Sequence, residues 1–487
     1  MANDDLIKVR KQKVEAIKKQ GIDPYPSVVS RSNSIKEIKD NFKKLANKKI
    51  TLAGRLMRLR LMGKACFGNI KDELGNIQIY FKYDNLGKKK FEFLKNIDLG
   101  DFLEVEGKLF NTKTGEITLD VSGYKILVKS LRPMPEKWHG IQNIETKHRQ
   151  RYLDLLANSN VKQRFIIRSK IVSALREILN KQGFIEVETP ILQAIPGGAA
   201  ARPFVTHYNA LDQDFYLRIA PELYLKRLLV GGFEKIYEIN RNFRNEGVDT
   251  SHNPEFTMFE LYYAYEDYEG LMKFVEDLMI KVIKMITGGN DIEYQSNKIN
   301  IKLPFKRITY KNVIEKYTGV DIFQHKDIKS LMGQIKKLKI KSWDLSGAPT
   351  WPKAVDELFK EKVSDNLIKP TFVINHPTEL SPLSKKRKEN SDEVERFQLY
   401  IGGLEIMNGF SELNDPVDQK ERFEAQAKLR KTGDEEAMLK DSDFIEALEY
   451  GMPPTAGLGM GIDRLVMLLT NQQSIREAIL FPHLRTK

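Results

Sequence analysis

The sequence has little cysteine and no long apolar run. Cys66 is the single cysteine among 487 residues, so no disulfide can form within the chain. Such scarcity is typical of a reducing compartment. No stretch approaches the roughly 18 consecutive apolar residues of a membrane helix, and residues 1–13 are charged, without the apolar core of a signal peptide. These absences predict a cytoplasmic protein.

The positive charge is unevenly distributed. Residues 1–150 contain 31 Lys and Arg against 18 Asp and Glu, which accounts for the whole net charge of +13. The remaining residues contain 48 of each sign. A basic module joined to a neutral one indicates that one part of the chain binds a polyanion and that a separate part carries the activity. The alternative is a basic surface that only aids solubility.

The pattern along the chain predicts four regions. Residues 1–45 are Lys-rich and helical, interrupted by a turn at 24–26. Short alternating runs at 50–55, 77–81, 102–109 and 116–121, separated by turn signals, predict a barrel of about five strands over 46–135. A basic barrel of this size is typical of the OB-fold, which binds single-stranded nucleic acid.

After a hinge that contains Pro133 and Pro135, a linker is expected over residues 136–160, and a long amphipathic helix from Val161. From there to residue 487, strands and helices mix without a strict βαβ rhythm. That favours an α+β domain with an antiparallel sheet over a doubly wound parallel one.

The segment 241–262 carries the densest chemistry. Arg244 and Glu246 are two residues apart, so on a strand they share a face, as do Glu260 and Tyr262 on a returning strand. An arginine can clamp a phosphate, and the acids can bind an amine or Mg²⁺. An ordinary hairpin with cross-strand ion pairs would show the same alternation.

Two later segments have a similar character. Asn408, Phe410 and Glu412 would share a strand face suited to a small ligand with a positive end, although Asn-Gly can also mark a turn. In 457–465, Gly457, Gly459 and Gly461 leave one strand face bare for a flat ring, with Asp463 expected as the N-cap of a following helix. A tightly packed structural strand is the alternative, and the dinucleotide fingerprint is incomplete.

Together with the strand-like segment 184–190, these segments have the order and spacing of the class II aminoacyl-tRNA synthetases. The chain resembles their motif 1 at about 165–190, motif 2 at about 235–265 and motif 3 at about 457–470. The preceding barrel is similar to the subclass of aspartyl, asparaginyl and lysyl enzymes. Within that subclass the chain closely resembles the lysyl-tRNA synthetases over nearly its whole length, including residues 62–67, 149–155, 196–199, 221–227 and 408–415.

The resemblance implies a role for each matching residue. It implies Arg244 and Arg464 as the catalytic arginines, at the α- and γ-phosphates. ATP binding is implied for Arg244, Glu246, His252, Asn253, Phe256, Glu405 and Arg464. Lysine binding is implied for Gly198, Glu222, Glu260, Tyr262, Asn408, Phe410 and Glu412. Anticodon binding is implied for Arg60, Phe67, Gln78 and Glu116, although Phe67 could instead belong to the barrel core.

One position departs from the family. Gln398 stands where an acid usually binds Mg²⁺ together with the residue matching Glu405. An amide is a weaker ligand for a hard cation, which predicts a weakened or water-mediated metal position. The resemblance further implies ATP, L-lysine and tRNA(Lys) as partners and a homodimer. A non-catalytic RNA-binding relative and an aspartate- or asparagine-specific enzyme are the alternatives, and the acidic pocket disfavours the second.

Overall fold

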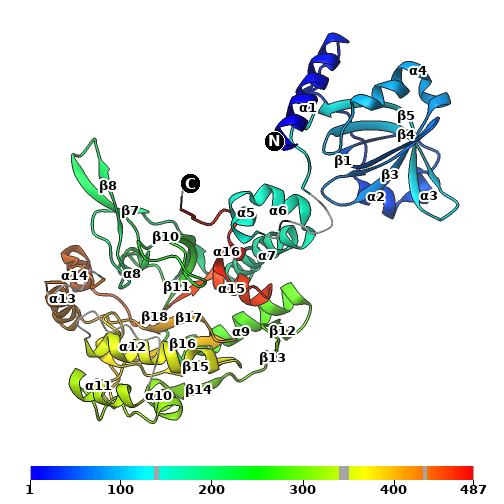
Figure 1. Cartoon of the computed structure of the whole chain (residues 1–487). Helices are drawn as coiled ribbons and strands as arrows, with labels where there is room; N and C mark the ends of the chain where they lie inside the picture. The colour runs from blue at the N-terminus through cyan, green and yellow to red at the C-terminus, as the bar shows by residue number, and fades with distance from the viewer. Residues whose placement is uncertain (1, 136–140, 142, 339–349, 432–435, 486–487) are drawn as a thin grey trace. The chain divides into compact units, whose positions relative to one another are not determined.

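The computed structural model describes residues 2–135, 141, 143–338, 350–431 and 436–485. The chain divides into two compact units, Met1–Gly140 and Ile141–Lys487, each considered by itself (Figure 1). Of the expected linker 136–160, residues 136–140 and 142 lie outside the described residues. Its later part forms helices of the second unit.

The first unit is built on a closed five-stranded barrel in the order β1-β2-β3-β5-β4. Its strands are β1 (Ile50–Met62), β2 (Ala65–Lys71), β3 (Asn76–Lys82), β4 (Phe102–Asn111) and β5 (Ile117–Val128). Along β2 and β3 the burial alternates strictly, so every second side chain enters the core. The expected OB-fold is confirmed.

The N-terminal helices belong to this barrel rather than to a separate arm. They are α1 (Ala2–Lys19), α2 (Ile35–Asp40) and α3 (Phe42–Leu45), followed later by α4 (Tyr83–Phe93) and η1 (Leu94–Asn96). Ile17, Ile35 and Ile38 are buried in the barrel's core. On the same face of α1 as Ile17, Arg10 donates to the carbonyl oxygens of Ser130 and Arg132.

The second unit is organised around an eight-stranded sheet in the order β14-β15-β16-β17-β18-β11-β10-β6. These strands are β6 (Ile185–Glu186), β10 (Lys235–Phe243), β11 (Glu255–Ala264), β14 (Lys306–Thr309), β15 (Thr371–Ile374), β16 (Arg396–Ile401), β17 (Leu404–Ser411) and β18 (Thr455–Gly461). The pairs are antiparallel except at the two edges, β14-β15 and β10-β6. The expected antiparallel α+β architecture is therefore confirmed.

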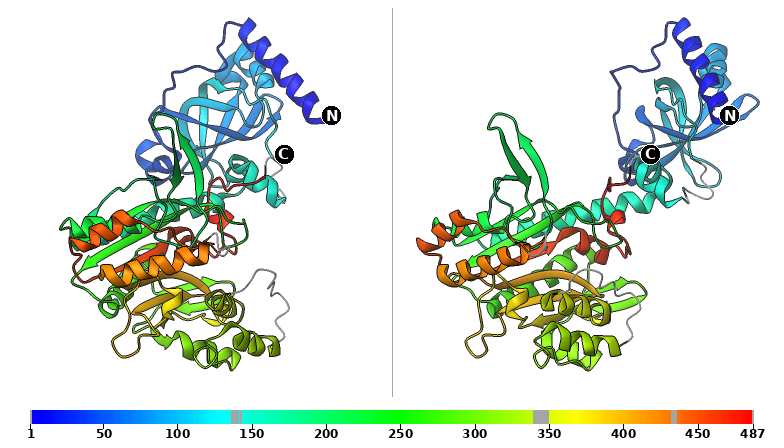
Figure 2. Two further views of the ribbon diagram at one scale, coloured as in Figure 1. Left: turned by 90° about the vertical axis from the view of Figure 1, so that its left-hand side faces the viewer. Right: turned by 60° about the vertical axis from the view of Figure 1, so that its left-hand side comes forward.

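Smaller sheets extend the unit. β7 (Leu192–Gln193), β9 (Gln213–Leu217) and β8 (Phe204–Tyr208) form one, and β12 (Asp291–Tyr294) and β13 (Asn297–Asn300) form another. Figure 2 shows the β8–β9 hairpin standing out from the body of the unit in both views. The predicted strand 184–190 is only two residues long as β6, because beyond Val187 the chain turns away from β10.

Helices cover the sheet. They are α5 (Ile144–Arg149), α6 (Arg151–Ala157), α7 (Ser159–Lys181), α8 (Glu222–Val230), α9 (Tyr268–Thr287), α10 (Tyr310–Thr318), α11 (Ile328–Lys337), α12 (Trp351–Lys362), α13 (Pro416–Lys431), α14 (Ser442–Glu449), α15 (Ile462–Leu469) and α16 (Ile475–Ala478), with η2 (Ser364–Asn366) and η3 (Thr378–Leu380). None of the described helices has the length and apolarity to cross a membrane.

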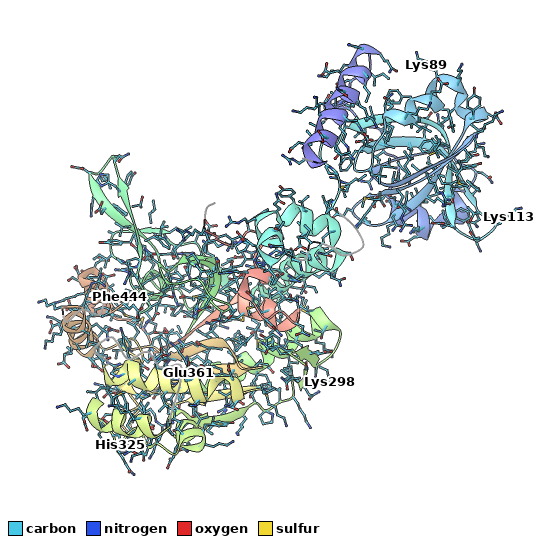
Figure 3. The ribbon with its side chains drawn as sticks, in the orientation of Figure 1. Lys89, Lys113, Lys298, His325, Glu361 and Phe444 are labelled. Carbon is cyan, nitrogen blue, oxygen red and sulfur yellow. The ribbon has the colours of Figure 1, made fainter. Side chains whose placement is uncertain are left out.

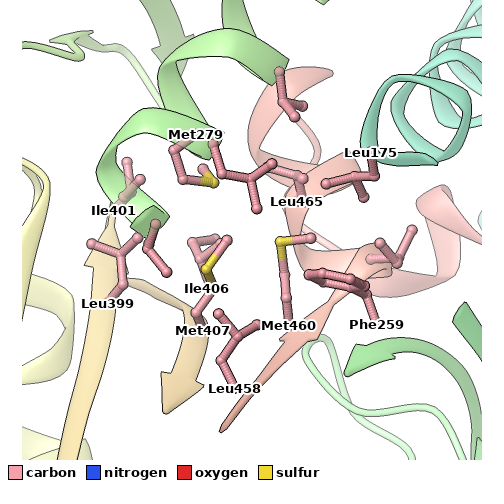
Figure 4. Packing of buried hydrophobic residues seen from close by; sticks show 14 of the residues in the cluster. Leu175, Phe259, Met279, Leu399, Ile401, Ile406, Met407, Leu458, Met460 and Leu465 are labelled. Carbon is pink, nitrogen blue, oxygen red and sulfur yellow. The ribbon is translucent and has the colours of Figure 1, made fainter. Parts of the chain in front are cut away.

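The main core lies between the sheet and the helices α7, α9 and α15. Leu175, Phe259, Met279 and Leu465 meet there around Met460 (Figure 4). Met460 comes from β18, whose other side chains on this face are also apolar. One face of β18 is thereby fixed against the core, so its opposite face, made of glycines, must face outward from it.

Candidate active site

A cavity of about 470 Å³ opens on the face of the sheet opposite that core. Its size is within the range of ligand pockets. The cavity brings together all fifteen residues that the sequence predicted for ATP, lysine and metal binding. They are Gly198, Glu222, Arg244, Glu246, His252, Asn253, Phe256, Glu260, Tyr262, Gln398, Glu405, Asn408, Phe410, Glu412 and Arg464. They come from three strands (β11, β16 and β17), two helices (α8 and α15) and the adjoining loops, and span about 270 positions of sequence.

The β10–β11 hairpin differs in one respect from its expected form. β10 ends at Phe243, so Arg244 and Glu246 lie in the following loop and not on a common strand face. A short turn replaces the ladder, since the Glu246 backbone N–H donates to the Arg244 carbonyl at 2.9 Å. The prediction was correct for the returning strand, where Glu260 and Tyr262 share a face and the Tyr262 hydroxyl donates to Glu260 at 3.2 Å.

Arg244 lies at the centre of one half of the cavity. Its guanidinium carbon is 5.1 Å from the centre of the Phe256 ring. Its buried Nε has no hydrogen-bond partner among the described residues, and neither has the buried Oδ1 of Asn253. Buried polar atoms normally find partners, so orphaned atoms lining a cavity indicate a polar ligand. His252 is held at the rim by Asp249, with 2.8 Å between Nδ1 and Oδ2.

The glycines of β18 form the floor, as their alternation predicted. Gly457, Gly459 and Gly461 line the cavity, while Leu458 and Met460 are buried on the other side. The expected N-cap was wrong: Gly461 precedes the helix α15, and Asp463 lies within its first turn. The Asp463 carboxylate instead accepts from the Thr257 backbone N–H and from Arg168, which ties α15 to β11 and α7.

The other half of the cavity is acidic. Glu222, Glu260 and Glu412 line it, all three nearly inaccessible to solvent. Burial raises the pKa of Glu412 to about 8. Burial and the neighbouring Glu222 raise the pKa of Glu260 well above its ordinary value. Buried carboxyl groups whose ionisation is this unfavourable are suited to a cationic ligand, which would favour their charged form.

A second set of contacts fixes side chains of β16, β17 and α15 around the cavity. Arg396 donates from Nε to Asn408 Oδ1 at 2.8 Å and from an NH group to the Leu380 carbonyl. Arg464 donates to the Glu405 carbonyl at 3.2 Å, and its guanidinium is 3.6 Å from the Glu405 carboxylate. Arg464 is thus placed by the same short strand that carries Glu405.

Gln398 is already engaged by a neighbour. Its Oε1 accepts a hydrogen bond of 2.9 Å from His376 Nε2. Burial lowers the pKa of His376 well below its ordinary value, so this imidazole is neutral. Among the described residues, no three His, Cys, Asp or Glu side chains form a group able to hold a metal ion by themselves.

Three residues of the site escaped the sequence analysis: Lys226, Arg396 and His376. Lys226 is fully buried beside Glu222 and Glu412. Its i,i+4 spacing from Glu222 was a readable signal, because such residues meet on a helix. Arg396 and His376 gave none, because each meets a partner 12 or 22 positions away through tertiary packing that no local spacing reports.

The four residues predicted on the barrel lie on β1, β2 and β3 and just before β5. Phe67 stacks on Tyr80 with 4.4 Å between ring centres and is outside the buried core, unlike its neighbour Cys66. Arg60 pairs with Phe67 across β1 and β2. Gln78 accepts from the Thr118 hydroxyl at 2.8 Å, and Glu116 is exposed. Lys89 and Lys113 are exposed on the barrel unit (Figure 3).

Comparison with known proteins agrees with this geometry. Residues 143–485 match the family of class II tRNA synthetases (D, K and N), and residues 50–127 match the OB-fold nucleic acid binding domain. The chain therefore belongs to the class II tRNA synthetases of this group.

The relatives narrow the assignment. The lysine–tRNA ligase of Carboxydothermus hydrogenoformans is 52% identical over 484 residues, which cover 99% of both chains. Those of Pelotomaculum thermopropionicum and Syntrophomonas wolfei are 50% and 48% identical, over 99% of this chain and 96% and 97% of theirs. All three relatives are lysine–tRNA ligases.

Proposed function

We propose that this chain is a lysine–tRNA ligase, which uses ATP to activate L-lysine and transfers it to the 3′ end of tRNA(Lys). One observation carries the proposal: three buried carboxylates line the cavity that also contains Arg244 and Arg464. A cation fits between carboxylates, whereas an aspartate or asparagine substrate would leave them unpaired at a cost of several kcal/mol.

Arg244 and Arg464 carry the activation step in this proposal. The lysine carboxylate attacks the α-phosphorus of ATP in line, and pyrophosphate leaves. Arg244 holds the α-phosphate and the lysine carboxylate together, while Arg464 binds the γ-phosphate end. The protein contributes positioning and charge neutralisation rather than a general base. The tRNA terminal hydroxyl then attacks the carbonyl carbon of the lysyl-adenylate, the mixed anhydride bond breaks, and AMP leaves.

The remaining ATP contacts follow from the side chains around Arg244. Phe256 offers a ring on which adenine stacks, and the orphaned Oδ1 of Asn253 offers an acceptor. Glu246 and His252 line the same half of the cavity. At the floor, the bare glycine face of β18 lets a flat ring approach the backbone.

The residues present fit a magnesium ion that is bound mainly through ATP. Mg²⁺ is usually held by one or two carboxylates together with substrate phosphates. Glu405 supplies one carboxylate, and it lines the cavity beside Arg464. Gln398 is the weaker candidate, because its oxygen is neutral and already accepts from His376. When bound, Mg²⁺ neutralises developing charge on the phosphates.

Lysine is proposed to lie across the acidic half. Gly198 and Glu222 bind its α-ammonium, Glu260, Tyr262 and Glu412 bind its ε-ammonium, and Asn408 and Phe410 line its aliphatic part. Gly198 has a positive φ of 85°, and a Cβ there would meet the Glu222 Cβ at 2.8 Å. A glycine is therefore needed for the close approach of the 197–198 turn to Glu222.

On the barrel, Arg60, Phe67, Gln78 and Glu116 are proposed to read the anticodon. Single-stranded bases are recognised by stacking on aromatic rings and by hydrogen bonds to their edges. The stacked Phe67–Tyr80 pair supplies the platform. A homodimer formed through the motif 1 region, drawn from the resemblance, and a cytoplasmic location, drawn from the composition, complete the proposal.

ATP–pyrophosphate exchange with each of the twenty amino acids tests the proposal. Exchange with lysine alone is the expected result. Preference for aspartate or asparagine would reassign the specificity. Absence of exchange with every amino acid, in a protein that still binds tRNA, would favour the non-catalytic alternative.

A further inference from the structure

Lys226 pairs with two carboxylates of the acidic half as a cation that the protein itself provides. Its side chain is fully buried. Its Nζ donates to Glu222 Oε1 at 2.6 Å and lies 2.5 Å from Glu412 Oε2. The Phe410 ring is 5.5 Å from the same ammonium. One lysine thus contacts two of the three carboxylates, from different elements of the fold.

The two carboxylates that Lys226 joins belong to opposite ends of the proposed substrate. Glu222 begins α8 and is proposed for the α-ammonium, while Glu412 follows β17 and is proposed for the ε-ammonium. Both oxygens of Glu412 are buried without a hydrogen bond of good geometry among the described residues. The short ion pair to Lys226 is therefore the contact that restrains this carboxylate.

The charges of the acidic half favour a diamino acid. Glu222, Glu260 and Glu412 bring three negative charges, and Lys226 brings one positive charge. Glu260 has the Tyr262 hydroxyl as its partner, and the nearby Arg218 is committed to Glu238 at 2.7 Å. Two ammonium groups of a substrate neutralise the remaining two charges. The carboxylate of the substrate is then bound by Arg244.

We infer that Lys226 is a positioning residue that sets the chain length of the amino acid. By binding Glu222 and Glu412 at once, it fixes the separation between the α- and ε-ammonium subsites. The inference rests on the proposed function. With the two carboxylates tethered, a shorter diamino acid such as ornithine cannot reach both subsites. Without the tether, Glu412 can follow the shorter chain.

The test is the ratio of kcat/KM for lysine and for ornithine in ATP–pyrophosphate exchange. A missing methylene changes kcat/KM by roughly 10–200-fold in a fixed apolar site. In Lys226→Met, which keeps the length and removes the charge, the lysine-to-ornithine ratio is expected to fall by about 10-fold or more. The KM for ATP is expected to stay unchanged, because Lys226 lies away from Arg244 and Phe256.

Two further variants keep the result interpretable. Lys226→Gln retains a donor without the charge and serves if the methionine variant does not fold; its ratio is also expected to fall. Lys129→Met is the matched control, because Lys129 is another fully buried lysine that pairs with two aspartates, Asp98 and Asp101, in the barrel unit. The Lys129→Met variant should be less stable than the wild type, and its lysine-to-ornithine ratio of kcat/KM should be unchanged.

An equal loss for lysine and ornithine in a folded Lys226 variant would overturn the inference and give Lys226 a purely structural role. Failure of the wild-type protein to activate lysine would instead overturn the proposed function. The two failures are therefore distinguishable in one set of measurements.

Discussion

Gly457 shows how one small residue makes room for two functional side chains. A Cβ at this position would lie 2.2 Å from Glu412 Oε1 and 2.5 Å from the Tyr262 ring. No real Cβ tolerates such distances, so any substitution would push one of these groups out of the acidic half. The glycine pattern was visible in the sequence, but the side chains that it accommodates were not, because they come from β11 and from the residue that follows β17.

Replacing Arg244 by alanine should lower the rate of lysine activation by about 10²-fold or more, as expected when one transition-state donor is lost. ATP–pyrophosphate exchange with lysine measures this rate. Lys298→Ala, on the exposed strand β13, is the control and should exchange normally (Figure 3). Near-normal exchange by the Arg244 variant would remove Arg244 from the mechanism.

The helices at the two ends of the second unit are joined by one acid. Glu477 of α16 accepts from His148 of α5 at 2.9 Å, pairs with Arg164 of α7, and lies 3.7 Å from Arg151 of α6. The hydrogen bond from His148 and the charges of Arg164 and Arg151, against the opposing effect of burial, lower the pKa of Glu477 to about 2. Segments more than 300 residues apart are therefore held by a carboxylate that must be ionised.

This pKa sets a direction for acid sensitivity. A lowered carboxyl pKa stabilises the fold fully above its unfolded value near 4.5, and the contribution disappears as pH falls towards 2. Glu477→Gln should lower the free energy of unfolding by about 2 kcal/mol at pH 7, after allowance for partial exposure. The difference from wild type should shrink at pH 3. Urea denaturation followed by circular dichroism measures both.

Glu449→Gln is the control for this prediction, because Glu449 is exposed at the end of α14. Its stability should equal that of the wild type at both pH values. If the Glu477 variant lost equal stability at pH 7 and pH 3, its effect would come from packing and not from the ionised carboxylate.

Sequence pattern predicted elements well where the periodicity was strong. The barrel strands and the long helix α7 followed from alternation and amphipathicity, which report directly on which face is buried. The pattern failed at element ends. Arg244 left its strand and Asp463 entered its helix, because contacts from outside the segment decide where an element stops.

Long-range placement was beyond the sequence for a different reason. Lys226 lies in the segment 221–227 that resembles the lysyl-tRNA synthetases, but its contact with Glu412 depends on how α8 packs beside the sheet. The hydrogen bond between His376 and Gln398 depends equally on tertiary packing. Resemblance to a family named the site residues, whereas their physical partners became visible only in the fold.

At the scale of the whole molecule, the proposed lysine activation and the proposed tRNA recognition belong to different units. The fifteen cavity residues belong to the second unit, and the aromatic pair Phe67–Tyr80 belongs to the first. Phe67→Ala should therefore raise the KM for tRNA in aminoacylation and leave pyrophosphate exchange unchanged. Phe93→Ala, which removes a ring packed near Tyr124 in the barrel core, controls for a loss of barrel stability. Equal damage to both steps by the Phe67 variant would refute this separation.

The N-terminal helix gives the barrel unit part of its excess charge. Lys8, Lys11 and Lys19 of α1 are exposed and line a shallow groove, whereas Arg10 and Lys13 are committed to the barrel. Deleting residues 1–45 would also remove buried Ile17, Ile35 and Ile38, so a deletion cannot separate charge from folding. Substituting the exposed lysines removes the charge and keeps the buried isoleucines in place.

The triple variant Lys8→Gln, Lys11→Gln and Lys19→Gln should weaken tRNA binding and make it less dependent on salt. Each phosphate contact contributes roughly 0.7–0.9 to the slope of log K against log salt concentration, so loss of three should reduce the slope by about 2. Filter binding of tRNA across a salt series measures it. The matched control replaces Lys298, Lys302 and Lys306, which are exposed on the second unit. Because both triple variants remove the same charge, an equal change in slope would mean that net charge, and not contact with α1, governs binding.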